Sequence, residues 1–440
     1  MASRWTRGLA VAAIAAGAAA GQAEGLVLVP AGRFTMGDPF GEGNRWERPL
    51  HAVYVNAFYM DAGEVTKALW DSVQRWAVDR GYSFGAAPGK APDHPVHSVS
   101  WYDCVKWCNA RSEKEGLTPC YYTSAMRADV YRMGELDLSE RHVAWTADGY
   151  RLPTEAEWEK AARGGAEGRR FAWSGSDTIN HTRANYCSYW VGGRPFYPYD
   201  DNPAEGFHPA YAVGAPYTSP AGVFPANGYG LYDLCGNVLE WCWDWYESQW
   251  YGRPGAALSD PHGPAAGAGR VKRGGSWGAY AFFCRAAHRE GAAPRYVNNV
   301  LGFRCVRSAG YRIRPEVRIN GAEAPAALRR GAVLSVDIAL STTTAMDADW
   351  WLAAATPAGT FAWDAGSGEW SPVSDPAALR PAYQGPLFEI PAPYTVLRMN
   401  TAGLPEGRYE FFFGLDTVMD GALDFEPTLT YGAGAATLGP

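Results

Sequence analysis

The chain has 440 residues, with 39 Lys and Arg against 46 Asp and Glu and a formal net charge of −7. This length favours two folded units, and 47% hydrophobic with 19% charged residues excludes a disordered chain. The negative charge and the lack of any Lys/Arg run exclude nucleic acid as a partner.

The first two dozen residues have the layout of a signal peptide. Arg4 and Arg7 precede an Ala-rich apolar stretch at 8–20, and small residues follow it. That stretch is shorter than the roughly 20 residues of a membrane span. We therefore expect a signal peptide at 1–23, no membrane span after its removal, and a periplasmic or extracellular mature protein.

Two segments of the following region carry helix signals. Residues 100–115 begin with a Ser cap and space their apolar side chains as in a half-buried helix. Residues 154–163 begin with a capping box, Thr154 and Glu157, and two glycines stop them. The remainder up to Ser308 predicts loops, turns and short strands. Such a region needs disulfides, bound cations or buried aromatic residues to hold it.

The cysteines all lie beyond the predicted signal peptide. They are Cys104, Cys108, Cys120, Cys187, Cys235, Cys242, Cys284 and Cys305. An even number of cysteines in an oxidising compartment favours disulfides. Zinc is the weaker alternative, because these spacings differ from the paired short spacings of structural zinc sites.

The sequence changes character after Ser308. Alternating β-type runs at 317–319 and 333–340 are separated by Gly, Pro and Asn turns, and no Cys or His occurs. This pattern predicts a small β-sandwich over 315–440, with the boundary between Ser308 and Arg314. The preceding unit then spans 25–308.

Short blocks of the larger unit occur in a characteristic order. They include RLPTEAEWE at 151–159, NGYGLYD at 227–233, GNVLEW at 236–241, RGGSW at 273–277 and LGFRC at 301–305. The ordered set resembles the formylglycine-generating enzyme (sulfatase-modifying factor) family over nearly the whole unit. The resemblance implies an α+β fold related to C-type lectins, with little regular secondary structure, here followed by the all-β sandwich.

The resemblance also implies structural calcium. A first set of ligands corresponds to the side chains of Asp233 and Glu240 and the backbone carbonyls of Gly236 and Val238. Two carboxylates flanking a glycine turn suit a hard cation, although both could instead cap the turn. A second set, in a less clearly matched stretch, corresponds to Asn185, Tyr186, Glu205 and Phe207.

The resemblance pairs Cys108 with Cys305 in a disulfide. The pairs Cys242 with Cys284 and Cys104 with Cys120 are further alternatives that the residues leave open. Members that generate formylglycine use two cysteines after Gly-Gly-Ser to bind copper and oxidise a substrate cysteine. Here the first position is Ala279, and Cys284 overlays the second. A Cu(I) site needs both thiolates, so we expect no sulfatase activation.

The candidate remnant of that site comprises Ser276, Trp277, Cys284 and Arg289. Whether a copper or iron centre persists elsewhere, and hence whether the protein is an enzyme, is left open by the residues. The first functional hypothesis is a calcium-stabilised binding module whose ligand is an exported protein, a peptide or a glycan. Its aromatic groove would be lined by Trp277, Tyr280, Phe282, Phe283 and His288.

The alternative is an oxidative enzyme with a nonheme metal, such as the peptide- or siderophore-maturing oxidases of the same superfamily. Cys284 discriminates between the two hypotheses. A free, exposed thiol at this position favours redox chemistry. A bridge from Cys284 to Cys242 favours the binding module.

Overall fold

The structure is a computed structural model that describes residues 25–309, 313–322, 325–342, 347–364, 367, 369–373, 380–386, 390–416 and 429–439. The predicted signal peptide lies outside the described residues. Among those described, no helix combines the length and apolar character needed to cross a membrane.

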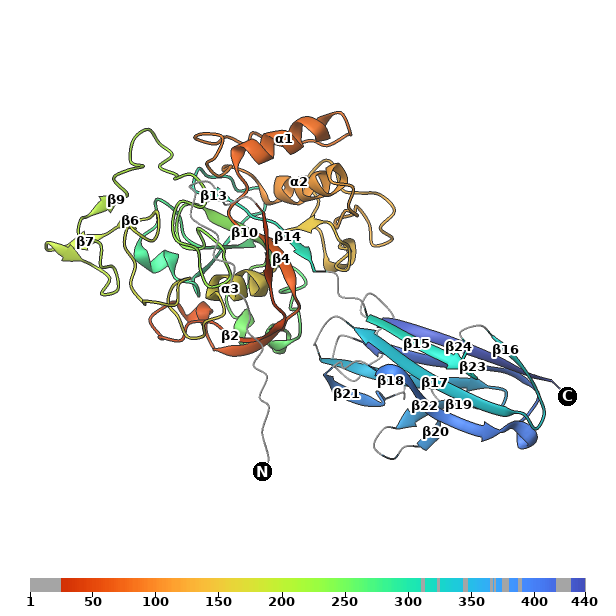
Figure 1. Ribbon diagram of the computed structural model, residues 1–440. Coiled ribbons are helices and arrows are strands. Elements are labelled where there is room, and N and C mark those ends of the chain that lie inside the picture. The colour runs from red at the N-terminus through yellow and green to blue at the C-terminus, as the bar shows by residue number, and fades with distance from the viewer. Residues whose placement is uncertain are drawn as a thin grey trace, which may run out of the picture.

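The larger part, up to residue 309, is mixed α and β, with long connecting loops (Figure 1). Its helices are α1 (Lys67–Val78), α2 (Trp101–Lys114) and α3 (Glu155–Arg163). Its strands are β1 (Leu26–Val29), β2 (Gly32–Met36), β3 (His51–Val55), β4 (Phe58–Asp61), β5 (Tyr150–Arg151), β6 (Cys187–Ser188), β7 (Trp190–Val191), β8 (Arg194–Pro195), β9 (Gly206–Phe207), β10 (Leu239–Trp245), β11 (Arg270–Arg273), β12 (Arg289–Ala292), β13 (Leu301–Gly302) and β14 (Val306–Ser308).

The caps of the helices explain where they begin and end. Ser100 caps α2 by accepting from the Asp103 N–H, and Thr154 forms the predicted capping box with Glu157 on α3. Gly164 ends α3 in the left-handed conformation that glycine tolerates. Helix α2 differs from expectation in being buried over residues 101–112, because it packs against α1 and β5 rather than facing solvent. Helix α1 was not predicted.

Two four-stranded sheets organise the larger part. Their strand orders are β1-β4-β14-β5 and β12-β11-β10-β13. Aromatic side chains fill the core beside α1 and α2, where the rings of Trp70 and Trp107 stack at 5.6 Å and Phe303 meets both edge-on. Buried aromatic residues are therefore one of the predicted means of holding this loop-rich region.

The eight cysteines are all unbonded thiols in this structure. The sulfur atoms of Cys108 and Cys305 lie 3.5 Å apart, so the disulfide implied by the resemblance stays a prediction. Cys104 and Cys120 lie in the same hydrophobic cluster as that pair. Cys242 and Cys284 lie together in the other cluster of the larger part, and both alternative pairings also stay predictions.

Buried arginine–carboxylate pairs form a feature that the sequence did not predict. In each pair the guanidinium donates one or two hydrogen bonds to the carboxylate. The pairs are Arg111–Asp61, Arg151–Glu157, Arg273–Glu159, Arg285–Glu47, Arg289–Glu155 and Arg304–Glu240. Removing one partner from such a pair typically costs about 3–5 kcal/mol, because the other charge remains buried.

The described residues from 313 onward form strands with one short 3-10 turn, in agreement with the expected sandwich. The strands are β15 (Ile313–Ile319), β16 (Ala326–Arg329), β17 (Val333–Thr342), β18 (Asp347–Thr356), β19 (Gly359–Asp364), β20 (Glu369–Val373), β21 (Tyr383–Pro386), β22 (Ile390–Asn400), β23 (Gly407–Asp416) and β24 (Leu429–Gly439). One sheet has the order β15-β17-β22, and the other has the order β16-β24-β23-β18-β19-β20 with β21 beside β18. A shared core, including Val336 and Phe413, joins the two sheets.

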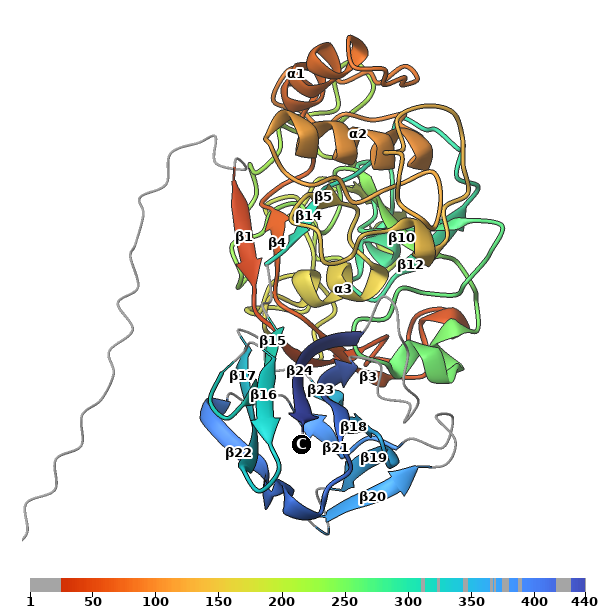
Figure 2. The ribbon, with the colours of Figure 1, turned by 90° about the vertical axis from the view of Figure 1, so that its right-hand side faces the viewer.

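The contact between the two parts is small. Strand β3 faces the sandwich, and its Tyr54 belongs to the sandwich core (Figure 2). β14 ends at Ser308 and β15 begins at Ile313. The separation into two independently folding units remains a prediction.

We expect limited proteolysis to cut between Ser308 and Arg314 and to leave two resistant fragments, because the cores on either side share little beyond Tyr54. Mass spectrometry of a trypsin time course locates the cuts. Early cleavage scattered through residues 315–440 would show that this part does not fold as a unit.

Candidate functional site

The candidate remnant site lies on a turn that follows β11. Gly274 and Gly275 adopt left-handed backbone conformations there, with φ of 99° and 73°. A Cβ on Gly275 would lie 2.7 Å from the sulfur of Cys284, so only glycine lets the turn close on this thiol. The N–H of Trp277 donates to the carbonyl of Asn237 at 2.8 Å, which fixes the turn to residue 237.

The predicted remnant residues do not form one accessible site. Ser276 is buried, and Arg289 is fully buried with Nε and Nη2 each 2.6 Å from a carboxylate oxygen of Glu155. Cys284 is fully buried in the hydrophobic core, where burial raises the pKa of its thiol well above the usual range. Trp277 alone of the four is partly exposed. Cys284 is therefore not the exposed thiol that would favour redox chemistry, and its bridge to Cys242 stays a prediction.

Two groups of aromatic side chains flank the turn. In the first, the rings of Trp277 and Tyr217 lie 5.1 Å apart, and Phe207 contacts both. In the second, Tyr280 stacks on Tyr189 at 4.7 Å. Together with Phe196, which contacts Tyr189, we call these six residues the aromatic face. Phe196 and Phe207 are 56% and 40% exposed, which is unusual for phenylalanine.

Short strands hold the aromatic face. β6 pairs with β9, which places Cys187 beside Phe207, and the N–H of Cys187 donates to the carbonyl of Ala279 at 2.9 Å. These strands lie at an end of the larger part remote from the sandwich (Figure 1). A protein surface that exposes several rings on a fixed backbone is suited to contact a partner.

The structure excludes His288 from the predicted aromatic groove, and the groove itself stays a prediction. His288 is only 2% exposed, so it lies behind Phe282 and Phe283 and lines no surface. Its Nδ1 lies 3.4 Å from Glu47 Oε1, and its Nε2 lies 3.1 Å from Glu290 Oε1. A histidine between two carboxylates is a polar support rather than part of an apolar groove.

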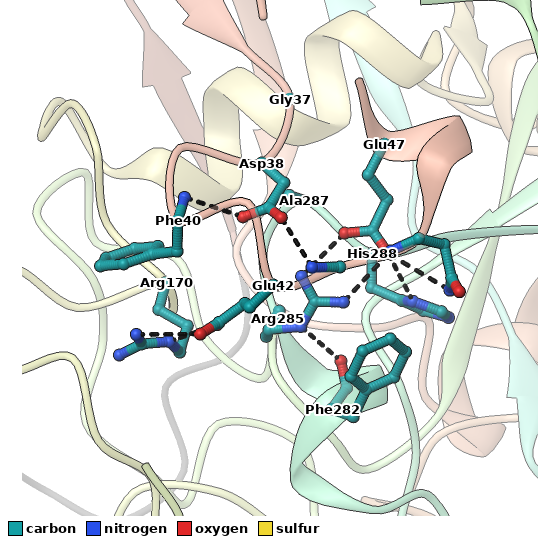
Figure 3. Close-up of polar contacts among 12 residues, drawn as sticks. Gly37, Asp38, Phe40, Glu42, Glu47, Arg170, Phe282, Arg285, Ala287 and His288 are labelled. Atoms are coloured by element: carbon teal, nitrogen blue, oxygen red, sulfur yellow. Dashed lines mark hydrogen bonds and ion pairs between the residues drawn. The ribbon is translucent and has the colours of Figure 1, made fainter. Parts of the chain in front are cut away.

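Glu47 is the centre of this support (Figure 3). Arg285 donates to its two oxygens at 2.7 and 2.9 Å and also donates to the carbonyl of Phe282 at 2.9 Å. Glu47 lies far from Arg285 in the sequence, so the pair ties the start of the chain to the aromatic turn. Burial raises the pKa of Glu47, but His288 and Arg285 outweigh it and lower that pKa to about 2.

The first set of predicted calcium ligands is only partly free to bind a cation. Both carboxylate oxygens of Glu240 accept hydrogen bonds from Arg304 at 2.7 Å, and one also accepts from Trp158 at 2.8 Å. Asp233 accepts from the N–H of Gly222 with Oδ2 at 2.6 Å, and its side chain also hydrogen-bonds that of Glu64. Gly236 and Val238 lie buried on the intervening turn. Glu240 is therefore poorly placed to ligate a metal.

The second set is brought together in part. Pairing of β6 with β9 places residues 187 and 188 beside 207 and 206, and the carbonyl of Tyr186 accepts from His181 Nε2 at 3.1 Å. Asn185 directs its amide nitrogen at the carbonyl of Tyr217, 2.8 Å away. Glu205 is exposed. Calcium binding by either set remains a prediction.

The sequence did not predict the buried carboxylates Glu47 and Glu64. It also did not predict the aromatic contact between Phe207 and Tyr217. Phe207 was considered only as a member of the second calcium set. No local pattern marks these residues, because each acquires its role from a partner distant in sequence. The exposed aromatic residues near 189–217 could have been found by their density around short turn-rich segments.

Acid should destabilise the protein through Glu47. Because the folded-state pKa of Glu47 is lowered from 4.5 to about 2, its stabilisation is complete above pH 4.5 and is lost as the pH falls toward 2. This amounts to roughly 3 kcal/mol. The variant Glu47→Gln should lose most of this stability at pH 7 and show a flatter unfolding curve between pH 5 and 3, measured by denaturant titration. The control Glu42→Gln removes a partly exposed pair with Arg170 and should change little. Equal pH profiles for wild type and Glu47→Gln would contradict the role of this pair.

Comparisons with known proteins agree with the family resemblance. A family model described as "Sulfatase-modifying factor enzyme 1-like domain" matches residues 12–309. A formylglycine-generating enzyme from Streptomyces coelicolor is 35% identical over 308 residues, covering 65% of this chain and 90% of that protein. A protein of Paenibacillus barcinonensis named "Chaperone protein LppX" is 34% identical over 261 residues, covering 57% of this chain and 78% of that protein.

Among solved structures, CarF is similar with 26% identity and a TM-score of 0.47, covering 65% of this chain and 98% of CarF. PvdO from Pseudomonas aeruginosa is similar with 27% identity and a TM-score of 0.45, covering 64% of this chain and 94% of PvdO. Since the family model spans most of the chain, this protein belongs to the sulfatase-modifying factor family, whose fold forms its larger part.

Proposed function

We propose that this chain is an exported, calcium-stabilised binding module that uses the aromatic face to hold an extended peptide segment of another exported protein. The observation that carries the proposal is the state of the two cysteine positions. Ala279 stands at the first, and Cys284 at the second is fully buried, whereas the aromatic side chains around them are partly exposed. The turn that would carry two thiolates in a formylglycine generator here presents rings instead.

The remaining thiol near the turn does not supply the missing ligand. Cys187 is half-buried, and burial together with the charges of Glu205 and Asp200 raises the pKa of its thiol to about 11. Copper binding requires the thiolate, and the surroundings of Cys187 disfavour that form. The oxidative alternative therefore has weaker support than the binding module.

A peptide suits the aromatic face better than a flat sugar ring does. Trp277 meets Tyr217 nearly edge-on, with 69° between the rings, so the surface is uneven rather than a planar stacking platform. Rings at different tilts make pockets for side chains of an extended chain. The named relatives also point to polypeptides, since one generates formylglycine and another is called a chaperone.

The protein should not convert a Cys-x-Pro-x-Arg peptide to the formylglycine product, even with copper and reductant. The reason is that one ligand position is Ala279, while the Cys284 thiol is fully buried and burial raises its pKa well above the usual range. Mass spectrometry of the peptide after incubation under air measures the aldehyde. Aldehyde that disappears in Cys284→Ala would instead make this a single-cysteine enzyme.

Binding should depend on Trp277. A cellulose-bound array of 12-residue peptides from exported proteins, read with purified mature protein, should give positive sequences. Trp277→Ala should weaken the best of these at least tenfold, or about 1.4 kcal/mol, as aromatic hot spots do. Fluorescence anisotropy with the labelled peptide measures the affinity.

The matched control is Trp76→Ala, which removes a half-buried tryptophan from α1 and should leave the affinity unchanged. A glycan array is run in parallel. Signals on glycans with none on peptides, or equal loss in both variants, would refute the peptide site.

A further inference from the structure

Strand β1 (Leu26–Val29) is an edge strand of the larger part. Among the described strands it pairs only with β4, and it lies at the rim of the larger part (Figure 2). An edge strand presents a row of unpaired backbone N–H and C=O groups to any other chain that meets it. Natural proteins usually protect such edges, so an unprotected one calls for an explanation.

The backbone groups of Leu26 and Leu28 point away from β4. The carbonyl of Gly25 accepts from the N–H of Ala62, and this pair continues the register of β1 on β4. In an antiparallel pair, residues that bond to the neighbouring strand alternate with residues that turn outward. Val27 therefore bonds to β4, whereas the N–H and C=O groups of Leu26 and Leu28 face the free edge. Within the described residues no backbone group of another segment meets them.

The edge of β1 lacks the usual protection. The strand contains no proline and no charged residue, and its pairing with β4 has no bulge. Among the described edge strands of at least four residues in sheets of three strands or more, β1 is the exception. Each of the others carries a proline or a charged side chain: Glu290 on β12, Pro315 on β15, Arg329 on β16, Pro372 on β20, Pro386 on β21 and Pro391 on β22.

Exposed apolar side chains border the same edge. Side chains alternate along a strand, so Leu26 and Leu28 share one face of the sheet, opposite to the core face of Val29. Val29 is fully buried, whereas Leu28 is 49% exposed. Tyr59, which pairs with Leu28 from β4, is 37% exposed. The free edge therefore combines open hydrogen-bonding groups with an uncovered apolar surface.

We propose that two copies of this chain associate by antiparallel pairing of their β1 strands. The open groups of Leu26 and Leu28 lie symmetrically about Val27. A two-fold axis at Val27 therefore places Leu26 of each copy opposite Leu28 of the other. Each copy contributes two N–H and two C=O groups, so the pairing makes four hydrogen bonds. The two four-stranded sheets become one continuous sheet.

A second copy suits this edge because the strand is complementary to itself. The pairing opposes no charges, since residues 25–32 contain none. It also gathers Leu26 and Leu28 of both copies on one face, beside Tyr59, and covers their exposed surface. Removal of the predicted signal peptide leaves too few residues before β1 to cover this edge from the same chain.

The dimer should be weak. A standard protein interface buries about 800 Å² of each partner, and a strand of four residues is too short to supply this area. We therefore expect a dissociation constant between about 10 µM and about 1 mM. The inference is independent of the proposed peptide binding, because the aromatic face is built on other strands.

Sedimentation equilibrium of the mature protein, from about 1 µM to about 1 mM, measures the association. Leu28→Lys places an ammonium group among the apolar side chains of the paired strands. It should raise the dissociation constant at least about tenfold. Because Leu28 is half exposed, the variant should keep the melting temperature of the wild type. The matched control is Leu50→Lys, since Leu50 is 46% exposed and lies outside β1 and β4. It should associate as the wild type does.

Hydrogen exchange gives a second readout that needs no variant. The amide protons of Leu26 and Leu28 in the wild-type protein should exchange more slowly as the protein concentration rises, and this holds even if Leu28→Lys does not fold. A wild-type protein that stays monomeric up to about 1 mM would overturn the proposal. Exchange at Leu26 and Leu28 that does not change with concentration, or equally tight association of a folded Leu28→Lys variant, would also overturn it.

Discussion

The pair of Glu240 and Arg304 holds the centre of the larger part. Strand β10 carries Glu240, and Arg304 lies between β13 and β14, so the pair joins the two main sheets. Its guanidinium also donates to the backbone carbonyls of Asp61, Ala62 and Tyr232. In a fold with long loops, such side chains do for the backbone what sheet hydrogen bonds do elsewhere.

The same device recurs around the aromatic turn. Arg285 fixes the turn to Glu47, and Arg289 fixes the strand after it to Glu155 on α3. These bidentate contacts set the backbone from which Trp277 and Tyr280 project. A backbone fixed by buried ion pairs keeps the aromatic side chains in place. Such a preorganised surface loses little conformational entropy on binding. The same backbone can therefore support a turn that carries two cysteines or a turn that carries aromatic side chains.

Local signals in the sequence predicted local structure. The Ser100 and Thr154 caps marked helices α2 and α3, and the alternation at 333–340 marked β17, because caps and alternation depend on neighbours a few residues away. Helix α1 was missed although Thr66 accepts a hydrogen bond from the N–H of Leu69 as its cap. The ordered motifs predicted the fold of the larger part through the family resemblance.

The site was harder to predict, because burial is decided by contacts across the whole chain. His288 and Cys284 stand in a segment rich in aromatic residues, so the sequence suggests that both are accessible. In the structure His288 contacts Glu47, and Cys284 lies in the hydrophobic core. Glu64 stands in an ordinary-looking segment, and only the geometry shows that it is buried against Asp233. A sequence lists charges, but it does not say which of them meet.

The long sequence separation of the charge pairs has a kinetic meaning. Arg285 and Glu47 are 238 residues apart, Arg289 and Glu155 are 134 apart, and Arg273 and Glu159 are 114 apart. Until both ends of the larger part have come together, each of these charges must stay hydrated, and the core around it cannot close. Folding of this part should therefore be slow and late, as it is for proteins dominated by distant contacts. A nascent chain that has exposed only its first half therefore cannot yet reach a compact state.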